Sequence, residues 1–444
     1  MATVFCDPGL ATGNDDGTDW EDAYQSLQDA IDNAGSGDEI WVKSRTITLT
    51  ARIDFDNSNA NSVYGGFAND LTGTNGSVAG RDLDTNITTL DGSDTYRCAY
   101  INNQSYTIDG LKFFDGYNAS LGGGMQIYLT SGTATIKNCV FDSNRSASGG
   151  AIYLSGGGTA DFDDCTFSNN SGISGGVIYL STSPATFDNC TFDSNSGSSA
   201  GSGVYASGSG AVTTITDCTF EDNTCSGYTG GAVTGGSSSD ITIVRCVFDN
   251  NTGATVGGAI YVGACCLSVT NSILINNGAG YGAGLYLSGG SENYILTNNT
   301  VSDNAATTDG GSIRNTGGAT TDVTNCILYG NTAGGSADEI ANAATINVTY
   351  SCVEGGYTGT GNTSSDPDFV GTGDDPYSIG SSSSCIDAAD SGATDYPSTD
   401  YLGNARVDDP NTTNTGTGTP DYADIGAYEY QPPAAEGSLL LALN

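Results

Sequence analysis

The chain has 444 residues, with 51 acidic and 11 basic side chains, no histidine and a formal net charge of −40. This charge makes nucleic acids and anionic membranes poor partners, and the sequence contains no run of about 20 apolar residues that could span a bilayer. A hydrophobic content of 37%, 24 tyrosines and a strict internal period argue against disorder and for an ordered solenoid.

Residues 1–39 predict a short strand followed by a capping helix. Apolar residues recur at helical spacing between residues 20 and 34, namely Trp20, Ala23, Leu27, Ala30, Ile31 and Ala34. A solenoid leaves its core open at each end and needs a cap there. We therefore expect an amphipathic helix over residues 20–34 that covers the first coil.

Residues 40–352 repeat, and the repeats are regular from residue 122 onward. One column of equivalent positions contains Leu111, Cys139, Cys165, Cys190, Cys218, Cys246, Ser272, Asn299 and Cys326, with Cys352 as its expected next member. Two residues later stand Phe141, Phe167, Phe192, Phe220, Phe248, Leu274, Val301 and Leu328. Three residues further on stand Asn144, Asn170, Asn195, Asn223, Asn251, Asn277, Asn304 and Asn331.

Short runs such as AIYL and CTF, separated by glycine, asparagine and serine, predict short β-strands rather than helices. No run can bury a face alone, but coils stacked about 4.8 Å apart bury all of them. The sequence therefore predicts an all-β, single-stranded, right-handed parallel β-helix in which like residues stack. The cysteine and phenylalanine columns should point inward, and the asparagine column should occupy a turn with left-handed backbone.

A Gly-x-x-x-Tyr pattern, first met at Gly124, places a tyrosine in most units. The tyrosines are Tyr128, Tyr153, Tyr179, Tyr205, Tyr261 and Tyr286. They alternate with apolar residues expected to point inward, so we expect the rings to face outward. Such a row could bind sugars or another copy of the protein. High β-propensity alone would also place tyrosine there, and both alternatives stay open.

Two oxygen-rich stretches, residues 13–19 and 366–375, are candidate calcium sites because Ca²⁺ takes oxygen ligands from flexible loops. The predicted ligands are Asp15, Asp16, Asp19, Asp366, Asp368 and Asp374. The alternative is a solvated acidic surface. The cysteines of the column are expected to be buried thiols, since stacked neighbours stand too far apart for a disulfide. Those outside the column could form disulfides that the sequence does not assign.

Residues 353–430 lose the period and are expected to form C-terminal coils and capping loops. Residues 431–444 form a proline-containing linker and the apolar tail SLLLALN. The tail contains Leu439, Leu440 and Leu441, and we expect it to pack as a strand on its own solenoid or on the next subunit. A head-to-tail contact of the second kind would build a homopolymer.

Several stretches resemble a known group of proteins. Units such as NCVFDSN, together with VYGGF, GRDLDTNITTLDG, CIDAAD, LGNARVD and DIGAYEY, are similar to secreted right-handed β-helix proteins of the pectate-lyase-like superfamily. They resemble in particular proteins with polymorphic-outer-membrane-type repeats and bacterial extracellular anchor-domain proteins. The resemblance implies the fold and export to the cell surface or the medium.

The resemblance also bears on catalysis. Pectate lyases of the superfamily bind Ca²⁺ through aspartates and abstract a proton with arginine or lysine, and related hydrolases and epimerases use a histidine. The basic residues of the regular repeats, Lys137, Arg145, Arg245 and Arg314, are not expected to share one face, and histidine is absent. We therefore predict a non-enzymatic extracellular solenoid with a structural or adhesive role, whose partner is itself or an extracellular polysaccharide. The alternative is a Ca-dependent, polysaccharide-lyase-like or carbohydrate-binding β-helix.

Overall fold

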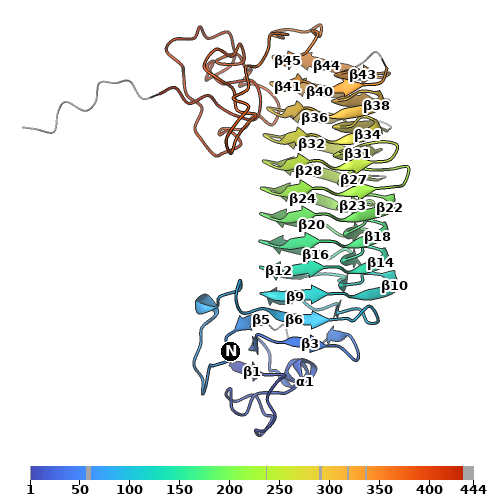
Figure 1. Cartoon of the computed structure of the whole chain (residues 1–444), viewed down its shortest axis with the longest axis vertical. Helices are drawn as coiled ribbons and strands as arrows, with labels where there is room; N and C mark the ends of the chain where they lie inside the picture. Colours follow the sequence, from blue (N-terminus) through green and yellow to red (C-terminus); the bar gives the residue numbers. More distant parts are fainter. Residues whose placement is uncertain are drawn as a thin grey trace, which may run out of the picture.

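The computed structural model describes residues 2–56, 62–236, 238–289, 293–317, 320–335 and 338–433. The chain winds as a parallel β-helix whose four sheets, named A to D here, run along its length (Figure 1). Each regular coil passes through sheets A, B, D and C in that order, as in β12, β13, β14 and β15. The predicted all-β parallel β-helix is confirmed.

Sheets A and B form two adjacent faces. Sheet A contains β1 (Thr3–Cys6), β2 (Glu39–Lys43), β5 (Ser62–Phe67), β8 (Thr107–Asp109), β12 (Thr133–Lys137), β16 (Thr159–Asp163), β20 (Ala185–Asp188), β24 (Val212–Thr216), β28 (Asp240–Val244), β32 (Cys266–Thr270), β36 (Tyr294–Thr297), β40 (Thr321–Thr324) and β44 (Ile346–Thr349). Sheet B contains β3 (Thr46–Thr48), β6 (Thr88–Asp91), β9 (Leu111–Phe114), β13 (Val140–Asp142), β17 (Thr166–Ser168), β21 (Thr191–Asp193), β25 (Thr219–Glu221), β29 (Val247–Asp249), β33 (Ile273–Ile275), β37 (Thr300–Ser302), β41 (Ile327–Tyr329) and β45 (Cys352–Val353).

Sheets D and C complete each coil. Sheet D contains β10 (Tyr117–Leu121), β14 (Arg145–Ser148), β18 (Ser171–Ser174), β22 (Ser196–Ala200), β26 (Thr224–Cys225), β30 (Thr252–Gly253), β34 (Gly278–Tyr281), β38 (Ala305–Asp309) and β42 (Thr332–Ala333). Sheet C contains β4 (Ile53–Phe55), β7 (Ala99–Asn102), β11 (Met125–Tyr128), β15 (Ile152–Ser155), β19 (Ile178–Leu180), β23 (Val204–Ala206), β27 (Val233–Gly235), β31 (Ile260–Gly263), β35 (Leu285–Ser288), β39 (Ile313–Asn315) and β43 (Ile340–Asn342). Within the described residues, the helical elements are α1 (Leu27–Asn33) and the 3-10 turn η1 (Val78–Gly80).

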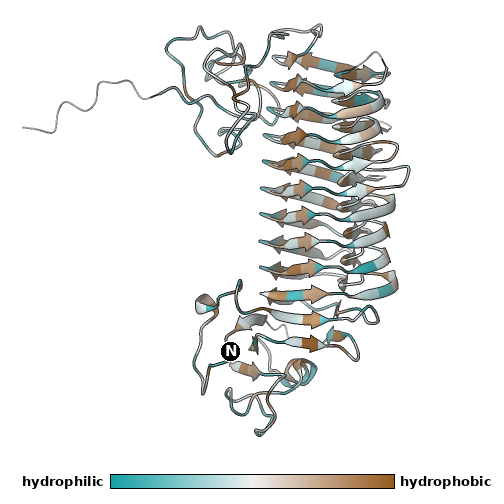
Figure 2. Cartoon of the chain, in the orientation of Figure 1, coloured by the Kyte–Doolittle hydropathy of each residue, from teal (hydrophilic) through white to brown (hydrophobic). Residues whose placement is uncertain are grey.

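The core consists of columns of stacked side chains that are identical over several consecutive coils. The phenylalanine column is buried, and its rings stack with centroids 4.5–5.1 Å apart from Phe113 to Phe248. The column from Leu111 to Cys326 is also buried, as predicted. Figure 2 shows hydrophobic residues concentrated on the strands, with hydrophilic residues in the connecting loops. Like residues stack because parallel strands pair in register, Phe141 with Phe167 for example.

The cysteine column does not continue to Cys352. Strand pairing places Cys352 opposite Ile327, so Ser351 follows Cys326 in the column. The Ser351 hydroxyl accepts a hydrogen bond from the Cys326 backbone N–H over 3.0 Å. The side chain of Cys352 therefore belongs to the alternate set of positions on sheet B, whose other members face away from the solenoid core.

The asparagine column is a buried hydrogen-bonded ladder. Asn144 Nδ2 donates to Asn170 Oδ1 over 3.0 Å and to the Phe113 carbonyl over 2.9 Å. The same two bonds recur along the column. The expected left-handed backbone lies one residue earlier, for example at Ser143, with φ 60°, and Asn169, with φ 57°. That prediction was wrong by one residue, because the ladder needs the asparagine side chain inside the coil while its outward neighbour makes the turn.

Glu339 ends the asparagine ladder. Its carboxylate oxygens accept hydrogen bonds from the backbone N–H of Asn331 over 3.2 Å and from its Nδ2 over 2.8 Å. These are the two bonds that the next asparagine accepts elsewhere in the ladder. Burial raises the pKa of the Glu339 carboxyl to about 8, so the neutral acid is the form that the ladder end favours.

The free energy of unfolding of the wild type should fall as pH rises, and Glu339→Gln should reduce this fall. A carboxyl whose pKa is raised on folding stabilises the protein fully below its unfolded pKa of about 4.3, and this contribution is lost as pH rises to about 8. Glutamine keeps an acceptor oxygen and stays neutral, so the variant should be more stable than wild type by a few kcal/mol at about pH 9 and similar at about pH 4. Denaturant unfolding at both pH values tests this, with the exposed Asp374→Asn as the control. Identical pH slopes for wild type and variant would contradict the assignment.

The N-terminal cap is shorter than predicted. Helix α1 covers Leu27–Asn33 alone and begins at an N-cap formed by Ser26. Trp20 and Ala23 are buried as expected but precede the helix, and the Trp20 ring packs against Phe5 with centroids 4.8 Å apart. Aspartate side chains bond backbone N–H groups in residues 14–25, which holds that segment in loop conformation.

Of the C-terminal region, the segment 354–365 covers the end of the solenoid. Residues 354–365 add a partial coil, in which Val353 N–H donates to the Thr363 carbonyl and Tyr357 packs on the main core. Residues 366–430, named the C-terminal clasp here, lie instead against the flank of the last coils, beside β32 to β41 (Figure 1). Residues 354–430 therefore divide into a partial coil at the end of the solenoid and a clasp on its flank.

The clasp is held by apolar and polar contacts. Ile273 and Ile275 on sheet B pack with Ala427 and Tyr428 of the clasp. Three turn asparagines donate to clasp carbonyls, namely Asn271 to Thr399, Asn298 to Asp424 and Asn325 to Asp390. The outward position of sheet B that is threonine in β21 and β25 is thus isoleucine in β33 and β41, where the clasp covers it, and in β37 it is Thr300, whose hydroxyl accepts from the Ala427 N–H of the clasp.

Candidate functional site

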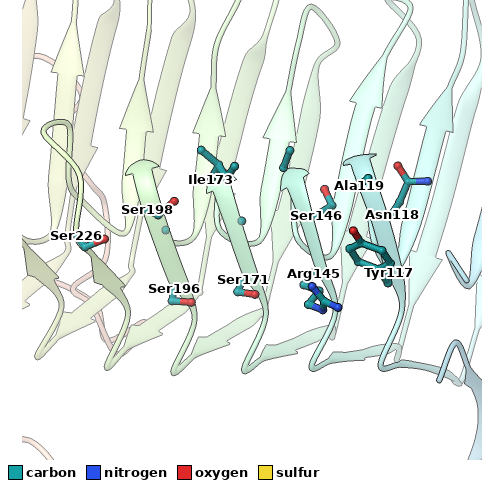
Figure 3. Close-up of a pocket in the computed structure, with 13 residues that line it drawn as sticks. Tyr117, Asn118, Ala119, Arg145, Ser146, Ser171, Ile173, Ser196, Ser198 and Ser226 are labelled. Atoms are coloured by element: carbon teal, nitrogen blue, oxygen red, sulfur yellow. The ribbon is translucent and has the colours of Figure 1, made fainter. Parts of the chain in front are cut away.

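A shallow groove crosses the outer face of sheet D over β10, β14, β18, β22 and β26 (Figure 3). Its volume is about 450 Å³. Tyr117 and Arg145 lie at one end, and Ser226 lies at the other. Ile173, with 54% of its surface exposed, adds an apolar contact between them.

The groove exists because sheet D is built from small residues. Gly172 and Gly197 pair in register on β18 and β22. A Cβ at Gly197 would come within 2.2 Å of the Gly201 carbonyl oxygen, at the corner where Gly201 takes φ 61°. Glycine at this inward position therefore allows the tight turn from sheet D to sheet C in this coil. Serine hydroxyls and backbone groups line most of the groove.

The single basic side chain in the groove is neutralised. The Arg145 guanidinium makes two hydrogen bonds with the Asp94 carboxylate, of 2.5 and 2.6 Å, and lies 4.2 Å from the Tyr117 ring centroid. The hydrogen bonds hold the pKa of Asp94 below its ordinary value and raise that of Arg145. Arg145 therefore holds the Tyr117 ring in position and offers no unpaired positive charge to a ligand in the groove.

All eleven basic residues lie in the described part of the chain, and each has a partner. Ten form ion pairs: Lys43 and Arg45 with Asp7, Arg52 with Asp54, Arg81 with Asp109, Lys112 with Asp142, Lys137 with Asp163, Arg145 with Asp94, Arg245 with Asp217, Arg314 with Asp309 and Arg406 with Glu429. The eleventh, Arg97, donates to the carbonyls of Leu121 and Gly122, and burial lowers its pKa to about 10. Acidic groups therefore dominate the unpaired surface charge.

The tyrosine row on sheet C forms as predicted for five of its six members. Tyr153, Tyr179, Tyr205, Tyr261 and Tyr286 are half-buried on the outer face. The ring centroids of Tyr153 and Tyr179 are 5.4 Å apart, and those of Tyr261 and Tyr286 are 5.7 Å apart.

Tyr128 does not belong to that row. It pairs with Ser155, while Gln126 occupies the row position opposite Tyr153. Three consecutive glycines allowed the misassignment, since Gly122, with φ 53°, takes the corner position assigned to Gly124. The sequence analysis also missed Tyr100, which pairs with Gln126 and therefore extends the row toward the N-terminus.

The predicted calcium ligands bond within their own loops. Asp15 accepts from Gln25 N–H, Asp16 from Thr18, Asp19 from Glu21 and Asp22, Asp366 from Asp368 N–H, and Asp368 from Ser382 N–H. Asp374 lies exposed in the clasp. Among the described residues, no three carboxylate or cysteine side chains come together to hold a metal ion. Calcium binding stays a prediction without an assembled set of ligands.

Two further predictions concern the ends of the chain and membranes. Leu439, Leu440 and Leu441 lie outside the described residues, so the packing of the tail stays a prediction. Within the described ranges, no helix has the length and apolar character needed to cross a membrane.

Comparison with known proteins identifies the fold. A family model described as a right handed beta helix region matches residues 30–192, 97–253 and 175–366. Among solved structures, the chain is similar to pectate lyase Pel9A, with 14% identity, 97% of each chain covered and a TM-score of 0.51. It is also similar to a mannuronic acid specific polysaccharide family 6 lyase from human gut microbiota, with 11% identity, 79% and 86% coverage and a TM-score of 0.43. No curated protein sequence matches the chain.

Proposed function

The chain belongs to the right-handed β-helix family, and we propose that it is a non-enzymatic extracellular or cell-surface solenoid with an adhesive role. Its groove on sheet D holds an uncharged polysaccharide chain. The observation that carries this proposal is that every basic side chain is engaged in an ion pair or a carbonyl contact. A groove that recognised an acidic glycan would need free positive charge.

The chemistry of the groove suits an uncharged sugar chain. The Arg145 guanidinium covers one face of the Tyr117 ring, so the exposed Ile173 side chain supplies the apolar contact for a sugar and the Tyr117 hydroxyl supplies a hydrogen bond. Ser171, Ser196 and Ser226 supply hydroxyls that both donate and accept hydrogen bonds. The net charge of −40 repels acidic polysaccharides at long range and leaves uncharged ones unaffected.

Filling the groove should abolish binding. Ser171→Tyr places a large side chain across the middle of the groove, whereas Thr166→Tyr places the same ring on sheet B of the same coil. We expect affinity for an uncharged polysaccharide, measured by affinity electrophoresis, to fall about tenfold or more for Ser171→Tyr and to stay at the wild-type value for Thr166→Tyr. Equal binding by both variants, or preference for polygalacturonate, would refute the groove assignment.

A Ca-dependent polysaccharide lyase is the second candidate function. It is supported by the similarity in fold to pectate lyase Pel9A. A lyase needs a base that removes a carbon-bound proton, and in this chain Arg145 and Arg245 each form two hydrogen bonds with one carboxylate. Incubation with pectate and alginate in the presence of Ca²⁺ distinguishes the two functions. Unsaturated products that disappear on chelation would favour the lyase, and their absence is the result we expect.

Self-assembly would add to the adhesive role without replacing it. The tail at residues 437–444 is the segment proposed to pack on a neighbouring subunit. Electron micrographs of the purified protein, with and without these residues, test this directly. Filaments that persist unchanged after the deletion would rule out a donated strand.

A further inference from the structure

Two cysteines lie in one buried cluster where the clasp meets the solenoid. Cys352 lies on the last strand, β45, opposite Ile327. Cys385 lies in the clasp, and both side chains are fully buried in one cluster with Ile327, Ile379 and Ile425. The Cys352 thiol is 3.1 Å from the Ser365 carbonyl oxygen, and interaction with Cys352 raises the pKa of the Cys385 thiol.

This pair differs from the stacked cysteines of the core. Neighbours such as Cys165 and Cys190 come from parallel backbones in register, about 4.8 Å apart, with side chains that point the same way. A disulfide needs Cβ atoms about 3.8 Å apart and side chains directed at each other. Cys352 belongs to the positions of sheet B that face away from the solenoid core, and Cys385 comes from an irregular segment in the same buried cluster, so no strand register holds these two side chains at the inter-strand spacing.

We propose that Cys352 and Cys385 form a disulfide that fastens the C-terminal clasp to the last coil. An external disulfide, such as oxidised glutathione, supplies the oxidising equivalents. One cysteine thiolate attacks the external disulfide, forms a mixed disulfide and releases one reduced thiol. The second cysteine then attacks the protein sulfur of that mixed disulfide, forms the Sγ–Sγ bond and releases the second reduced thiol. The two cysteine protons end on the two released thiols, and the external disulfide is reduced by two electrons.

The bond would have to form before the clasp closes. Interaction with Cys352 and burial raise the pKa of the Cys385 thiol well above its ordinary value, so the closed form holds little thiolate. An oxidising compartment would keep the bond once formed, in agreement with the proposed extracellular location. Persistence of the disulfide in the cell rests on the proposed extracellular location. Its formation in vitro with glutathione does not.

The full chain is refolded with a mixture of reduced and oxidised glutathione and then denatured without reductant. We expect two fewer titratable thiols than the 13 of the reduced chain, and a linked peptide pair that contains Cys352 and Cys385. Cys385→Ser should retain no such linkage, whereas Cys165→Ser in the core column should retain it. A full set of 13 thiols in the wild type, or linkage through other cysteines alone, would overturn the proposal.

Limited proteolysis provides a second measurement. Reductant should raise the rate of cleavage within residues 366–430 of the wild type and leave that of Cys385→Ser unchanged. Equal rates for the wild type with and without reductant would count against a fastening role. The groove on sheet D lies on earlier coils and takes no residue from the clasp. Polysaccharide binding by the same samples therefore tests the proposed function separately from the disulfide.

Discussion

Replacing Phe192 by alanine is expected to lower the free energy of unfolding by about 3–5 kcal/mol. The ring is fully buried and stacks between Phe167 and Phe220, with centroid distances of 4.8 and 4.5 Å. Backbone hydrogen bonds between the coils fix their spacing, so the neighbouring rings cannot close over the cavity. The cost should therefore lie at the upper end for a core deletion. Denaturant unfolding measures the loss.

Tyr179→Ala is the matched control for Phe192→Ala. Tyr179 also stacks along the solenoid, 5.4 Å from Tyr153, and its hydroxyl contacts Ser207. Its ring lies on the outer face and is half-buried, so its removal creates no internal cavity. The expected loss is about 1 kcal/mol or less. Equal losses for the two variants would mean that the outer row stabilises the solenoid as much as the core.

The fold could be predicted because the repeat period places residues of the same type at equivalent positions in successive coils. The columns of cysteine, phenylalanine and asparagine each occupy one position in the coil, and the Asn144 to Asn170 bond follows from that stacking. The period alone does not determine which single residue of a coil joins a column, since the number of residues per coil varies. The coil from Cys326 ends at Ser351, one residue earlier than the 26-residue spacing to Cys352 suggested.

The clasp and the groove were not predictable from the period. The isoleucines at Ile273, Ile275 and Ile327 were the available signal for the clasp, because an apolar outward position needs a cover. The groove gives no such signal. Its serines and glycines also suit turns, and the partner of Arg145 is Asp94, 51 residues earlier in the chain. Only the winding of the coils brings these two residues together.

Arg406→Met should release the clasp from the solenoid. The Arg406 guanidinium bonds the Glu429 carboxylate over 2.9 Å, with 3% and 0% of the two side chains exposed, and it also reaches Asn271 on the solenoid. Methionine would leave Glu429 buried without a counter-charge, and breaking a buried pair in this way costs about 3–5 kcal/mol. Arg245→Met, which breaks the more exposed pair with Asp217, should cost about 1 kcal/mol or less.

The loss in Arg406→Met should be local and should depend on pH. Burial raises the pKa of Glu429 even beside Arg406, so without the arginine the carboxyl should protonate at a still higher pH, and the clasp should regain stability as pH falls. Adding Glu429→Gln should restore part of the lost stability at neutral pH, because the amide carries no charge and its oxygen can still accept one of the two backbone N–H groups, of Val407 and Asp424, that the carboxylate oxygens accept. Hydrogen exchange measures this by region. Faster exchange confined to the clasp and the coils beneath it is expected, because the stacked coils around Phe192 make their own contacts. Uniformly faster exchange would mean instead that the clasp holds the whole solenoid together.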